Sequence, residues 1–266
     1  MISFVIPALN EEQNIARCIR SIQDDMRATG TSAEIVVVDN GSEDRTSEIA
    51  REFGVIVMIE PRKGTNRARQ TGFEHLNAPL VAFIDADCEL CPGWIARALQ
   101  RMSTDAGVAC VAGPYRFNGP LWFKAGAWLA FASIKFLNRA GLHTMMGGNY
   151  LVRSSYLLAI GGHNTGIAFY GDDCDTAKRL AAVGRVVFDL QLKVKSSDRR
   201  FRQEGYLRTL WNYGVVGFLG THFSPSRPRS FQTPHPRLRD LKPIADIGTR
   251  PRRRGEMVTG SLIQEQ

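Results

Sequence analysis

The chain has 266 residues, of which 44% are hydrophobic and 23% charged, and this ordinary globular composition excludes a disordered or fibrous protein. Its net charge of +8 is unevenly placed, because residues 193–266 carry +9 and residues 1–192 carry −1. The basic excess belongs to the last quarter of the chain, so we expect no nucleic-acid partner for the main body.

The N-terminus and the cysteines favour a cytoplasmic protein. The opening apolar run has no basic leader and stops at Pro7, and nowhere do about 18 apolar residues follow one another. Five cysteines without framework spacing fit a reducing compartment. Cys88 and Cys91 form a CxxC with no second pair, so a zinc or redox role is disfavoured against an ordinary structural one.

Residues 1–112 alternate short apolar runs with helical patterns. This alternation predicts an α/β fold with a doubly wound, mostly parallel sheet and right-handed crossovers. Ligands of such sheets bind beyond the carboxyl ends of the strands. The expected strands are 2–6, 34–39, 55–60, 80–85 and 108–113, and the expected helices are 10–26 with Asn10 as N-cap, 42–53 with Ser42 as N-cap, 66–76 and 93–102.

The pattern changes in the second half of the chain. We expect an aromatic-rich helix over 121–141, a strand over 147–153, a helix over 154–162, a helix that opens on acids and stops at Gly184, and a last strand over 186–190. Residues 193–223 predict a basic, then apolar C-terminal helix. Residues 224–266 are rich in Pro and Arg without periodicity and predict a poorly ordered tail.

Polar residues follow three of the expected strands, in the segments 7–12, 39–42 and 85–87. Turn and capping preferences explain Asn10, Gly41 and Ser42, but not two carboxylates two residues apart after a buried strand. Asp85 and Asp87 present the hard oxygens that a divalent cation takes together with substrate phosphates. Such a cation would neutralise charge on a diphosphate leaving group.

A second acidic group comprises Asp172, Asp173 and Asp175, directly after Gly171. Acids in a first helical turn are favoured by the helix dipole, which is one explanation. Crowded carboxylates also raise one another's proton affinity, which suits a general base acting on a hydroxyl. Spacing alone leaves both open.

The segments PALNEE, VVVDNGSEDRT, KGTNRARQTG, FIDADC, GGNYLVRSSYLLAIGG and GDDCD occur in this order over roughly residues 1–190. As an ordered set they resemble the family 2 glycosyltransferases, which have the GT-A fold. The resemblance implies a nucleotide-sugar donor, usually a UDP-sugar, and Mg²⁺ or Mn²⁺. Residues 1–112 would form the donor half and residues 113–192 the acceptor and catalytic half, with a helical acceptor-side and C-terminal extension.

The resemblance also implies roles for single residues. In the donor site, Asp39 would contact the base, Arg69 would lie near base or phosphate, Asp85 would lie by the ribose and the metal, and Asp87 would bind the metal. Asp172 and Asp173 match the family's catalytic pair, with Asp173 as the base of a single, inverting displacement. The remaining expected contacts are Pro7, Ala8, Asn10 and Glu11 around the nucleotide, and Gly148, Asn149, Arg199 and Arg200 on the acceptor side.

Three departures from the family pattern stand out. Asp172 replaces the usual Glu, Gln70 replaces the usual Asn, and the Gln-x-x-Arg-Trp motif of the processive members is absent together with their membrane helices. Arg199 and Arg200 suit either a diphosphate or a solvated basic face. The alternatives to an inverting transferase are a retaining GT-A enzyme, a nucleotidyltransferase (disfavoured because PALNEE is not a Gly-rich phosphate loop), and a non-catalytic membrane-docking relative.

The acceptor is hardly encoded. The aromatic residues of 121–141 suit either the core of a helix packed on the sheet or an acceptor- or lipid-contacting face; they are Trp122, Phe123, Trp128, Phe131 and Phe136. The basic segment 193–254 adjoins the apolar stretch 211–220, which suits an anionic cytoplasmic membrane face and a lipid-linked acceptor, or else a solvated tail. We therefore expect a cytoplasmic protein, which the first of these alternatives would place peripherally on the inner membrane face, and an acceptor that is either a sugar or a lipid-linked molecule.

Overall fold

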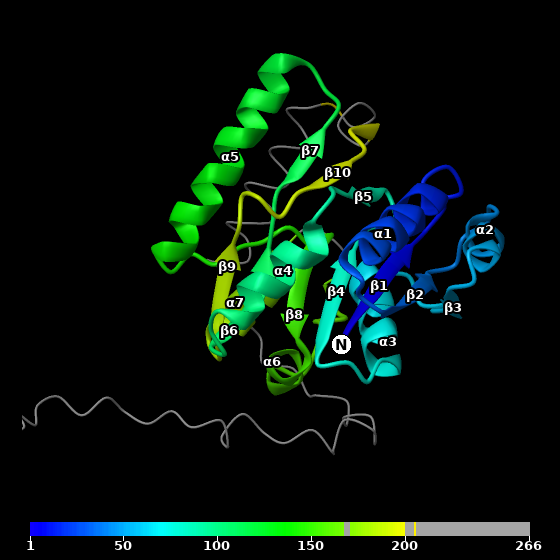
Figure 1. Ribbon diagram of the computed structural model, residues 1–266, viewed down its shortest axis with the longest axis horizontal. Helices are drawn as coiled ribbons and strands as arrows, with labels where there is room; N and C mark the ends of the chain where they lie inside the picture. The colour runs from blue at the N-terminus through cyan, green and yellow to red at the C-terminus, as the bar shows by residue number, and fades with distance from the viewer. Residues whose placement is uncertain (168–170, 200–204, 206–266) are drawn as a thin grey trace, which may run out of the picture.

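The computed structural model describes residues 1–167, 171–199 and 205, and within them the chain forms two sheets (Figure 1). The larger has the strand order β3-β2-β1-β4-β8-β6-β9, and the smaller has the order β5-β10-β7. The strands are β1 Ile2–Ala8, β2 Ala33–Asp39, β3 Ile56–Ile59, β4 Leu80–Ile84, β5 Cys88–Leu90, β6 Val108–Ala112, β7 Tyr115–Phe117, β8 Asn149–Arg153, β9 Arg185–Phe188 and β10 Val194–Ser196. The helices are α1 Ile15–Thr29, α2 Thr46–Glu52, α3 Thr65–His75, α4 Trp94–Ser103, α5 Leu121–Arg139, α6 Ser154–Ala159 and α7 Asp172–Ala181.

The large sheet is mostly parallel, as predicted. Strand β1 pairs in parallel with β2 and β4, β2 with β3, and β6 with β9. Strand β8 is antiparallel to both of its neighbours, β4 and β6. The carboxyl ends of β1, β2 and β4 therefore share one edge, and the amino end of β8 lies there too.

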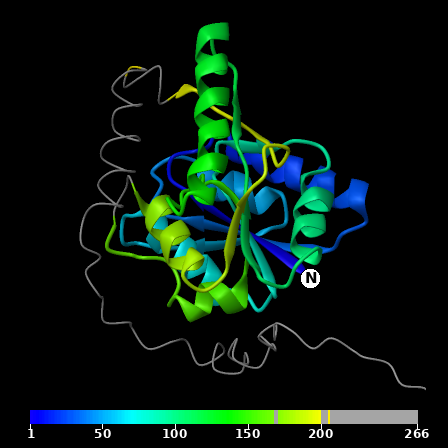
Figure 2. The ribbon, with the colours of Figure 1, turned by 90° about the vertical axis from the view of Figure 1, so that its left-hand side faces the viewer.

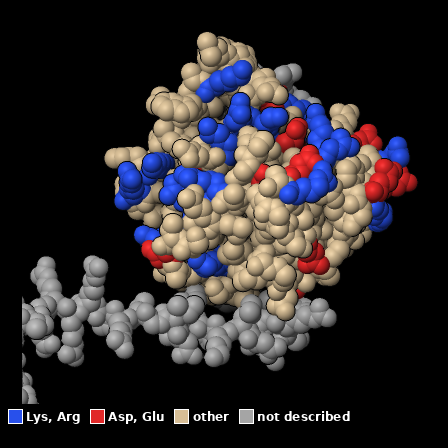
Figure 3. Space-filling view, in the orientation of Figure 1, with Lys and Arg blue, Asp and Glu red and all other residues tan. Residues whose placement is uncertain are grey.

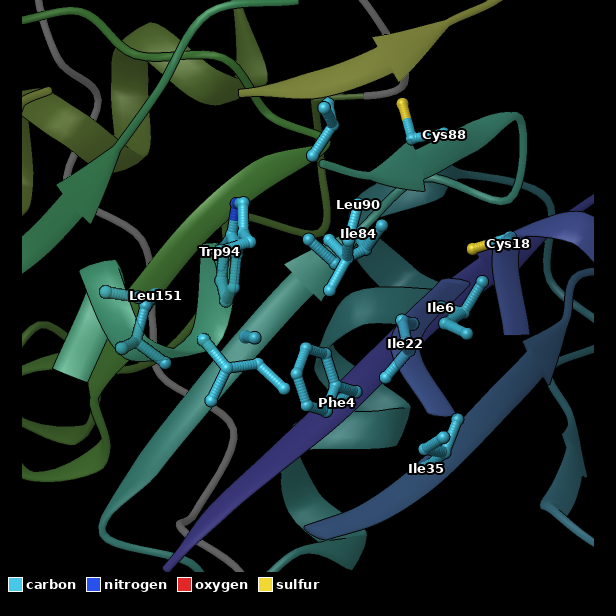
Figure 4. Packing of buried hydrophobic residues seen from close by; sticks show 14 of the residues in the cluster. Phe4, Ile6, Cys18, Ile22, Ile35, Ile84, Cys88, Leu90, Trp94 and Leu151 are labelled. Atoms are coloured by element: carbon cyan, nitrogen blue, oxygen red, sulfur yellow. The ribbon is translucent and has the colours of Figure 1, made fainter. Parts of the chain in front are cut away.

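Helices cover both faces of this sheet. Alternate side chains of β1 point to opposite faces, so Phe4 packs with Ile22 and Trp94 from α1 and α4, while Val5 joins the core under α3 and α5–α7 (Figure 4). Every residue of β1 is buried. This two-sided burial explains why the parallel strands are continuously apolar in sequence.

Two helices begin several residues after the N-cap positions predicted from the sequence. Helix α1 begins at Ile15 rather than after Asn10, and α2 begins at Thr46 rather than after Ser42. Asn10 instead adopts a positive φ of 54°, and its Oδ1 accepts a hydrogen bond from the Glu43 amide at 2.9 Å. The Asn10 amide in turn donates to Ser42 Oγ at 2.9 Å. Both polar residues thus join the loops after β1 and β2, which positions these loops against each other.

The small sheet was not predicted. Strand β10 pairs antiparallel with β5 and parallel with β7, so the strand over 186–190 is not the last one. A strand of three residues carries no periodicity long enough to detect, and β10 lies where a helix over 193–223 was expected to begin. Of the expected helix over 193–223, the structure describes only residues 193–199 and 205. The expected tail over 224–266 lies outside the described residues.

Two further expectations concern membranes and cysteines. Among the helices that the structure describes, none is long and apolar enough to cross a membrane. All five cysteines, Cys88 and Cys91 included, are free thiols.

Candidate active site

The guanidinium of Arg69 joins the two acidic groups of the sequence. This side chain projects from α3 and is only 4% exposed. Its Nη2 donates to Asp85 Oδ1 at 3.0 Å, and its Nη1 donates to Asp172 Oδ2 at 2.6 Å. The end of β4 and the start of α7 are thereby held together at the carboxyl edge of the sheet, where the topology predicts a ligand site.

Two glycines let the polypeptide pass close to this ion-pair network. A Cβ on Gly148 would overlap Asp85 Oδ2, and a Cβ on Gly147 would stand 3.1 Å from Arg69 Nη2 and 3.3 Å from Asp173 Cβ. The Asp85 amide donates to the Gly148 carbonyl at 3.2 Å, and the Gly148 amide donates to the Tyr115 hydroxyl at 2.9 Å. Gly148 therefore lies against the expected metal-binding segment.

Asp85 and Asp87 follow β4 and are both half-buried, while Ala86 between them is buried. Asp85 uses Oδ1 for Arg69, and Asp87 Oδ1 accepts a weak hydrogen bond from Cys88 Sγ at 3.6 Å. In the described part of the chain no group of three or more His, Cys, Asp or Glu side chains is placed to hold a metal by itself. Two hard carboxylates fit a cation whose coordination a diphosphate completes.

Asp173 has the environment of a base. Burial, together with the negative charge of Asp172, raises the pKa of its carboxyl to about 7, although the Cys174 amide and Arg69 act in the opposite direction. Its Oδ1 accepts a hydrogen bond from the Cys174 amide at 2.8 Å. A carboxyl that titrates near neutrality can exchange protons with a substrate at physiological pH.

The three acids of α7 thus differ in their contacts. Asp172 lies on Arg69, and Asp175 pairs with Arg179 at 2.8 Å, four residues along the same helix. Arg179 also donates to the carbonyls of Ile160 and Gly162, so it ties the helix to the preceding turn. Of the three, Asp173 has no side-chain cation in direct contact among the described residues.

The donor-side residues lie where β1 and β2 end. Pro7 and Ala8 are opposite Val38 and Asp39 in the parallel register. Asp39 is buried, and its Oδ1 accepts from the amides of Gly41 at 3.1 Å and Ser42 at 2.7 Å, while Oδ2 accepts from Ser47. The structure therefore gives the Asp39 carboxylate a role in shaping the loop after β2.

Arg199 lies beside the donor segment. Its Nη2 donates to Glu11 Oε1 at 2.6 Å, so the segment after β10 reaches the loop after β1. Arg199 was expected on the acceptor side, whereas in the structure it contacts Glu11, one of the residues expected around the nucleotide. Arg200 lies outside the described residues.

Asn149 is a core residue rather than an exposed one. Its side chain is fully buried, with Oδ1 accepting from Trp94 Nε1 at 2.8 Å and Nδ2 donating to the carbonyls of Leu192 at 2.8 Å and Pro114 at 3.3 Å. These bonds join β8 to the neighbouring loops and to α4. The position speaks against direct contact between this amide and an acceptor.

The sequence did not single out Asn66 and Tyr115, both of which support the site. Asn66 Oδ1 accepts from Arg69 Nη1 at 3.3 Å, and Asn66 Nδ2 donates to the Asn164 carbonyl at 3.1 Å. The i, i+3 spacing of Asn66 and Arg69 was a readable signal, because such residues share a helix face. Tyr115 gave no signal, since its partner Gly148 is distant in sequence.

Comparison with known proteins gives a consistent picture. Residues 3–161 match the family model described as Glycosyl transferase family 2. Glycosyltransferase AglE of Haloferax volcanii is 34% identical over 125 residues, 45% of this chain and 40% of the relative. An undecaprenyl-phosphate 4-deoxy-4-formamido-L-arabinose transferase of Edwardsiella ictaluri is 31% identical over 133 residues, 47% of this chain and 40% of the relative. The matched region is thus about 40% of the length of these relatives.

Solved structures share the fold. The mannosyltransferase PcManGT of Pyrobaculum calidifontis, in complex with GDP-Man and Mn²⁺, superposes with a TM-score of 0.67 at 19% identity, covering 88% of this chain and 66% of that one. Glucosyl-3-phosphoglycerate synthase of Mycobacterium tuberculosis, in complex with Mn²⁺ and UDP-Glc, superposes with a TM-score of 0.61 at 20% identity, covering 85% and 80%.

Proposed function

The chain belongs to glycosyl transferase family 2 and has the GT-A fold, and from this premise we propose that it transfers a sugar from a nucleotide-diphosphate donor to an acceptor hydroxyl. One observation carries the proposal. Arg69 brings the carboxylates that follow β4 and those that open α7 to one place, beside an Asp173 carboxyl with a pKa near 7. A donor site and a proton acceptor are then adjacent, as group transfer to a hydroxyl requires.

In the proposed reaction Asp173 takes the proton of the acceptor hydroxyl as that oxygen attacks the anomeric carbon. The bond to the diphosphate breaks as the new glycosidic bond forms, and the nucleoside diphosphate leaves from the opposite face. This single in-line displacement inverts the anomeric configuration and needs no covalent enzyme intermediate. Asp172 stays paired with Arg69 and keeps Asp173 a stronger base than an isolated aspartate.

Asp87, with Asp85, would hold Mg²⁺ or Mn²⁺. When bound, the cation supplies charge neutralisation for the departing diphosphate. Support comes from the two oxygen donors at the end of β4 and from the relatives of known structure, which were crystallised with Mn²⁺. One of those complexes holds UDP-Glc and the other GDP-Man, so a UDP-sugar is the donor that we propose and a GDP-sugar is the first competitor to test.

The acceptor that we propose is lipid-linked, with the enzyme bound peripherally at the cytoplasmic face of a membrane. Support comes from the names of relatives that act on undecaprenyl phosphate. The donor-side and acceptor-side contacts named from the sequence remain part of the proposal, except that Asn149 acts as a core residue and Arg199 sits on Glu11.

The test is Asp173→Asn, assayed by release of nucleoside diphosphate with a panel of nucleotide sugars and Mn²⁺. Transfer should be abolished while metal-dependent nucleotide binding stays close to that of the unchanged protein. Asp175→Asn is the matched control, because that residue lies in the same helical turn but pairs with Arg179. Loss of nucleotide binding in Asp173→Asn would assign this residue to the donor site instead.

The same assay separates the alternatives. Pyrophosphate in place of nucleoside diphosphate would identify a nucleotidyltransferase. A product that keeps the donor's anomeric configuration, read by NMR, would identify a retaining enzyme. Absence of turnover across the whole donor panel would indicate a non-catalytic relative.

A further inference from the structure

Helix α5 is apolar on two opposite sides. Its inner side buries Phe123, Phe131 and Ile134. The Phe131 ring lies 6.4 Å from that of Tyr115 and 6.5 Å from that of Phe188, so this side packs on β7 and β9. The spacing of the buried residues is that of one helix face.

The outer side carries large apolar residues that are exposed to solvent. Half of the ten large exposed hydrophobic residues in the described part of the chain belong to this one helix. They are Leu121 at 82%, Trp122 at 61%, Trp128 at 65%, Leu129 at 66% and Phe136 at 71% exposure. A helix that is apolar all round is normally buried, and a contiguous exposed patch of this kind marks an interaction surface.

The charges on α5 are all of one sign. The helix contains Lys124, Lys135 and Arg139, each exposed, and no acidic residue. Figure 3 shows tan and blue rather than red over this helix at the upper left of the molecule. Tryptophan beside lysine and arginine is the composition that settles at the boundary between lipid headgroups and acyl chains, and a positive helix complements an anionic bilayer.

The geometry of α5 suits a helix lying on a bilayer. Its 19 residues correspond to about 28 Å. It projects from the body as a ridge, which Figure 2 shows in green at the top. Because no described helix is long and apolar enough to span a membrane, an in-plane arrangement remains for α5.

Helix α5 is also connected to the acceptor side of the site. At its last turn Asn138 Nδ2 donates to the Thr144 carbonyl at 3.0 Å, and the Thr144 hydroxyl lies 3.0 Å from Cys174 Sγ, next to Asp173. Tyr115, which packs on Phe131, accepts the Gly148 amide beside Asp85. A surface that binds α5 is therefore held next to the catalytic centre.

We propose that the outer face of α5, formed by its five exposed apolar residues and its three basic residues, docks the protein on an anionic lipid bilayer. The apolar side chains enter the headgroup region, and the basic ones contact anionic headgroups. Resting on the proposed function, this docking places the catalytic centre where a lipid-linked acceptor is embedded.

The first test is quenching of tryptophan fluorescence by brominated lipids in vesicles of phosphatidylcholine and phosphatidylglycerol. The full chain has four tryptophans, and Trp211→Phe leaves Trp94, Trp122 and Trp128. Trp94 is 2% exposed and serves as an internal unquenched reference. We expect strong quenching of the two α5 tryptophans.

The second test is flotation of the full chain with the same vesicles. Trp128→Gln/Leu129→Gln/Phe136→Gln should lower the fraction bound by at least about tenfold, because three apolar side chains no longer enter the lipid. Ile59→Thr/Val183→Thr is the matched control, since both residues are exposed and apolar but lie elsewhere. Lys124→Glu/Lys135→Glu should weaken binding to anionic vesicles more than Arg27→Glu/Arg51→Glu, which makes the same change in net charge on α1 and α2.

Vesicle binding of the α5 variants equal to that of the unchanged protein, or no quenching of Trp122 and Trp128, would overturn the proposal. A dimer in sedimentation that the Gln variant converts to a monomer, with vesicle binding unchanged, would assign the surface to a second copy instead. Donor binding, measured without vesicles, should be equal in all of these variants. If the unchanged protein binds no nucleotide-sugar donor in this measurement, the proposed function is refuted, while the result on vesicle docking still holds.

Discussion

At the scale of single residues, the site depends on one buried guanidinium, that of Arg69, which several carboxylates share. Arg69 contacts Asp85 and Asp172 directly and lowers the pKa of Asp173 through space. Its Nε is buried without a hydrogen-bond partner among the described residues, and the hydrogen bonds to the two carboxylates are made by Nη1 and Nη2. A lysine has neither the fork geometry nor the reach to serve both acids.

The pKa of Asp173 predicts the pH dependence of activity. Burial and the neighbouring Asp172 raise this pKa from 3.8 to about 7, so the carboxylate needed as a base is lost as the pH falls through 7. We expect kcat/KM to rise about tenfold per pH unit below pH 7 and to level off above it. Asp172→Asn removes the neighbouring charge and should move this limb to lower pH, and Asp175→Asn should leave it in place. If Asp172→Asn leaves the acidic limb of the pH profile where it is in the unchanged protein, Asp173 is not the base.

Removing the guanidinium of Arg69 should affect both the stability of the protein and the pKa of Asp173. Arg69→Met leaves Asp172 nearly buried without its partner, and we expect a loss of roughly 2–4 kcal/mol in the free energy of unfolding, measured in urea. The remaining folded protein should titrate Asp173 at a higher pH, because the charge that lowers its pKa is gone. Arg45→Met removes an arginine whose pair with Glu48 is exposed on both sides, and it is the control, with a smaller loss and an unmoved pH profile. Equal losses in both variants would argue against a central role for Arg69.

At the scale of elements, the sequence predicts what is long or strongly patterned. Strands β1, β2 and β4 are continuous apolar runs followed by polar residues, so both their existence and the polar edge beyond them were readable. Strands β5, β7 and β10 have three residues each, and their pairing depends on partners distant in sequence. For the same reason the burial of Asn149 and the pairing of Arg199 with Glu11 were not predictable, because each depends on a contact that no local pattern records.

Helix α4 shows how one element completes another. Gly93 at its N-terminus has no side chain to cap the helix, and Asp25 of α1 supplies the cap by accepting the amides of Gly93 at 2.6 Å and Ile95 at 2.7 Å. Asp25 is 4% exposed, so the bonds are protected from water. Asp25→Ala should lower the free energy of unfolding by roughly 1–3 kcal/mol, because the buried amide of Ile95 and the partly buried hydrogen bond of the Gly93 amide lose their acceptor.

The neighbouring Asp24 provides the control for this cap. Its pair with Arg27 is exposed on both sides, so Asp24→Ala should cost less than about 0.5 kcal/mol in the same urea titration. Similar costs for the two variants would mean that the trans cap does not stabilise α4.

At the scale of the whole molecule, the charge distribution and the topology divide the chain at different places. By charge, the basic region begins at Lys193. By topology, β10 at Val194–Ser196 belongs to the folded body, since it lies between β5 and β7 and Val194 is fully buried. Strand β5 directly follows Asp87, so the pairing of β5 in the small sheet fixes the backbone next to the expected metal site.

Truncation distinguishes these two boundaries. A chain ending at Leu192 lacks β10, which leaves β5 and β7 without their shared partner and exposes the core that Val194 covers. A chain ending at Gly205 keeps β10 and the Glu11–Arg199 pair. We expect the shorter chain to be less stable than the longer one by roughly 2–4 kcal/mol, from one buried valine and the lost ladder hydrogen bonds. Because β5 holds the segment after Asp87, the shorter chain should also bind the nucleotide donor with Mn²⁺ more weakly. Equal thermal stability and equal donor binding in the two chains would place residues 193–199 with the basic appendage and remove the small sheet from the support of the site.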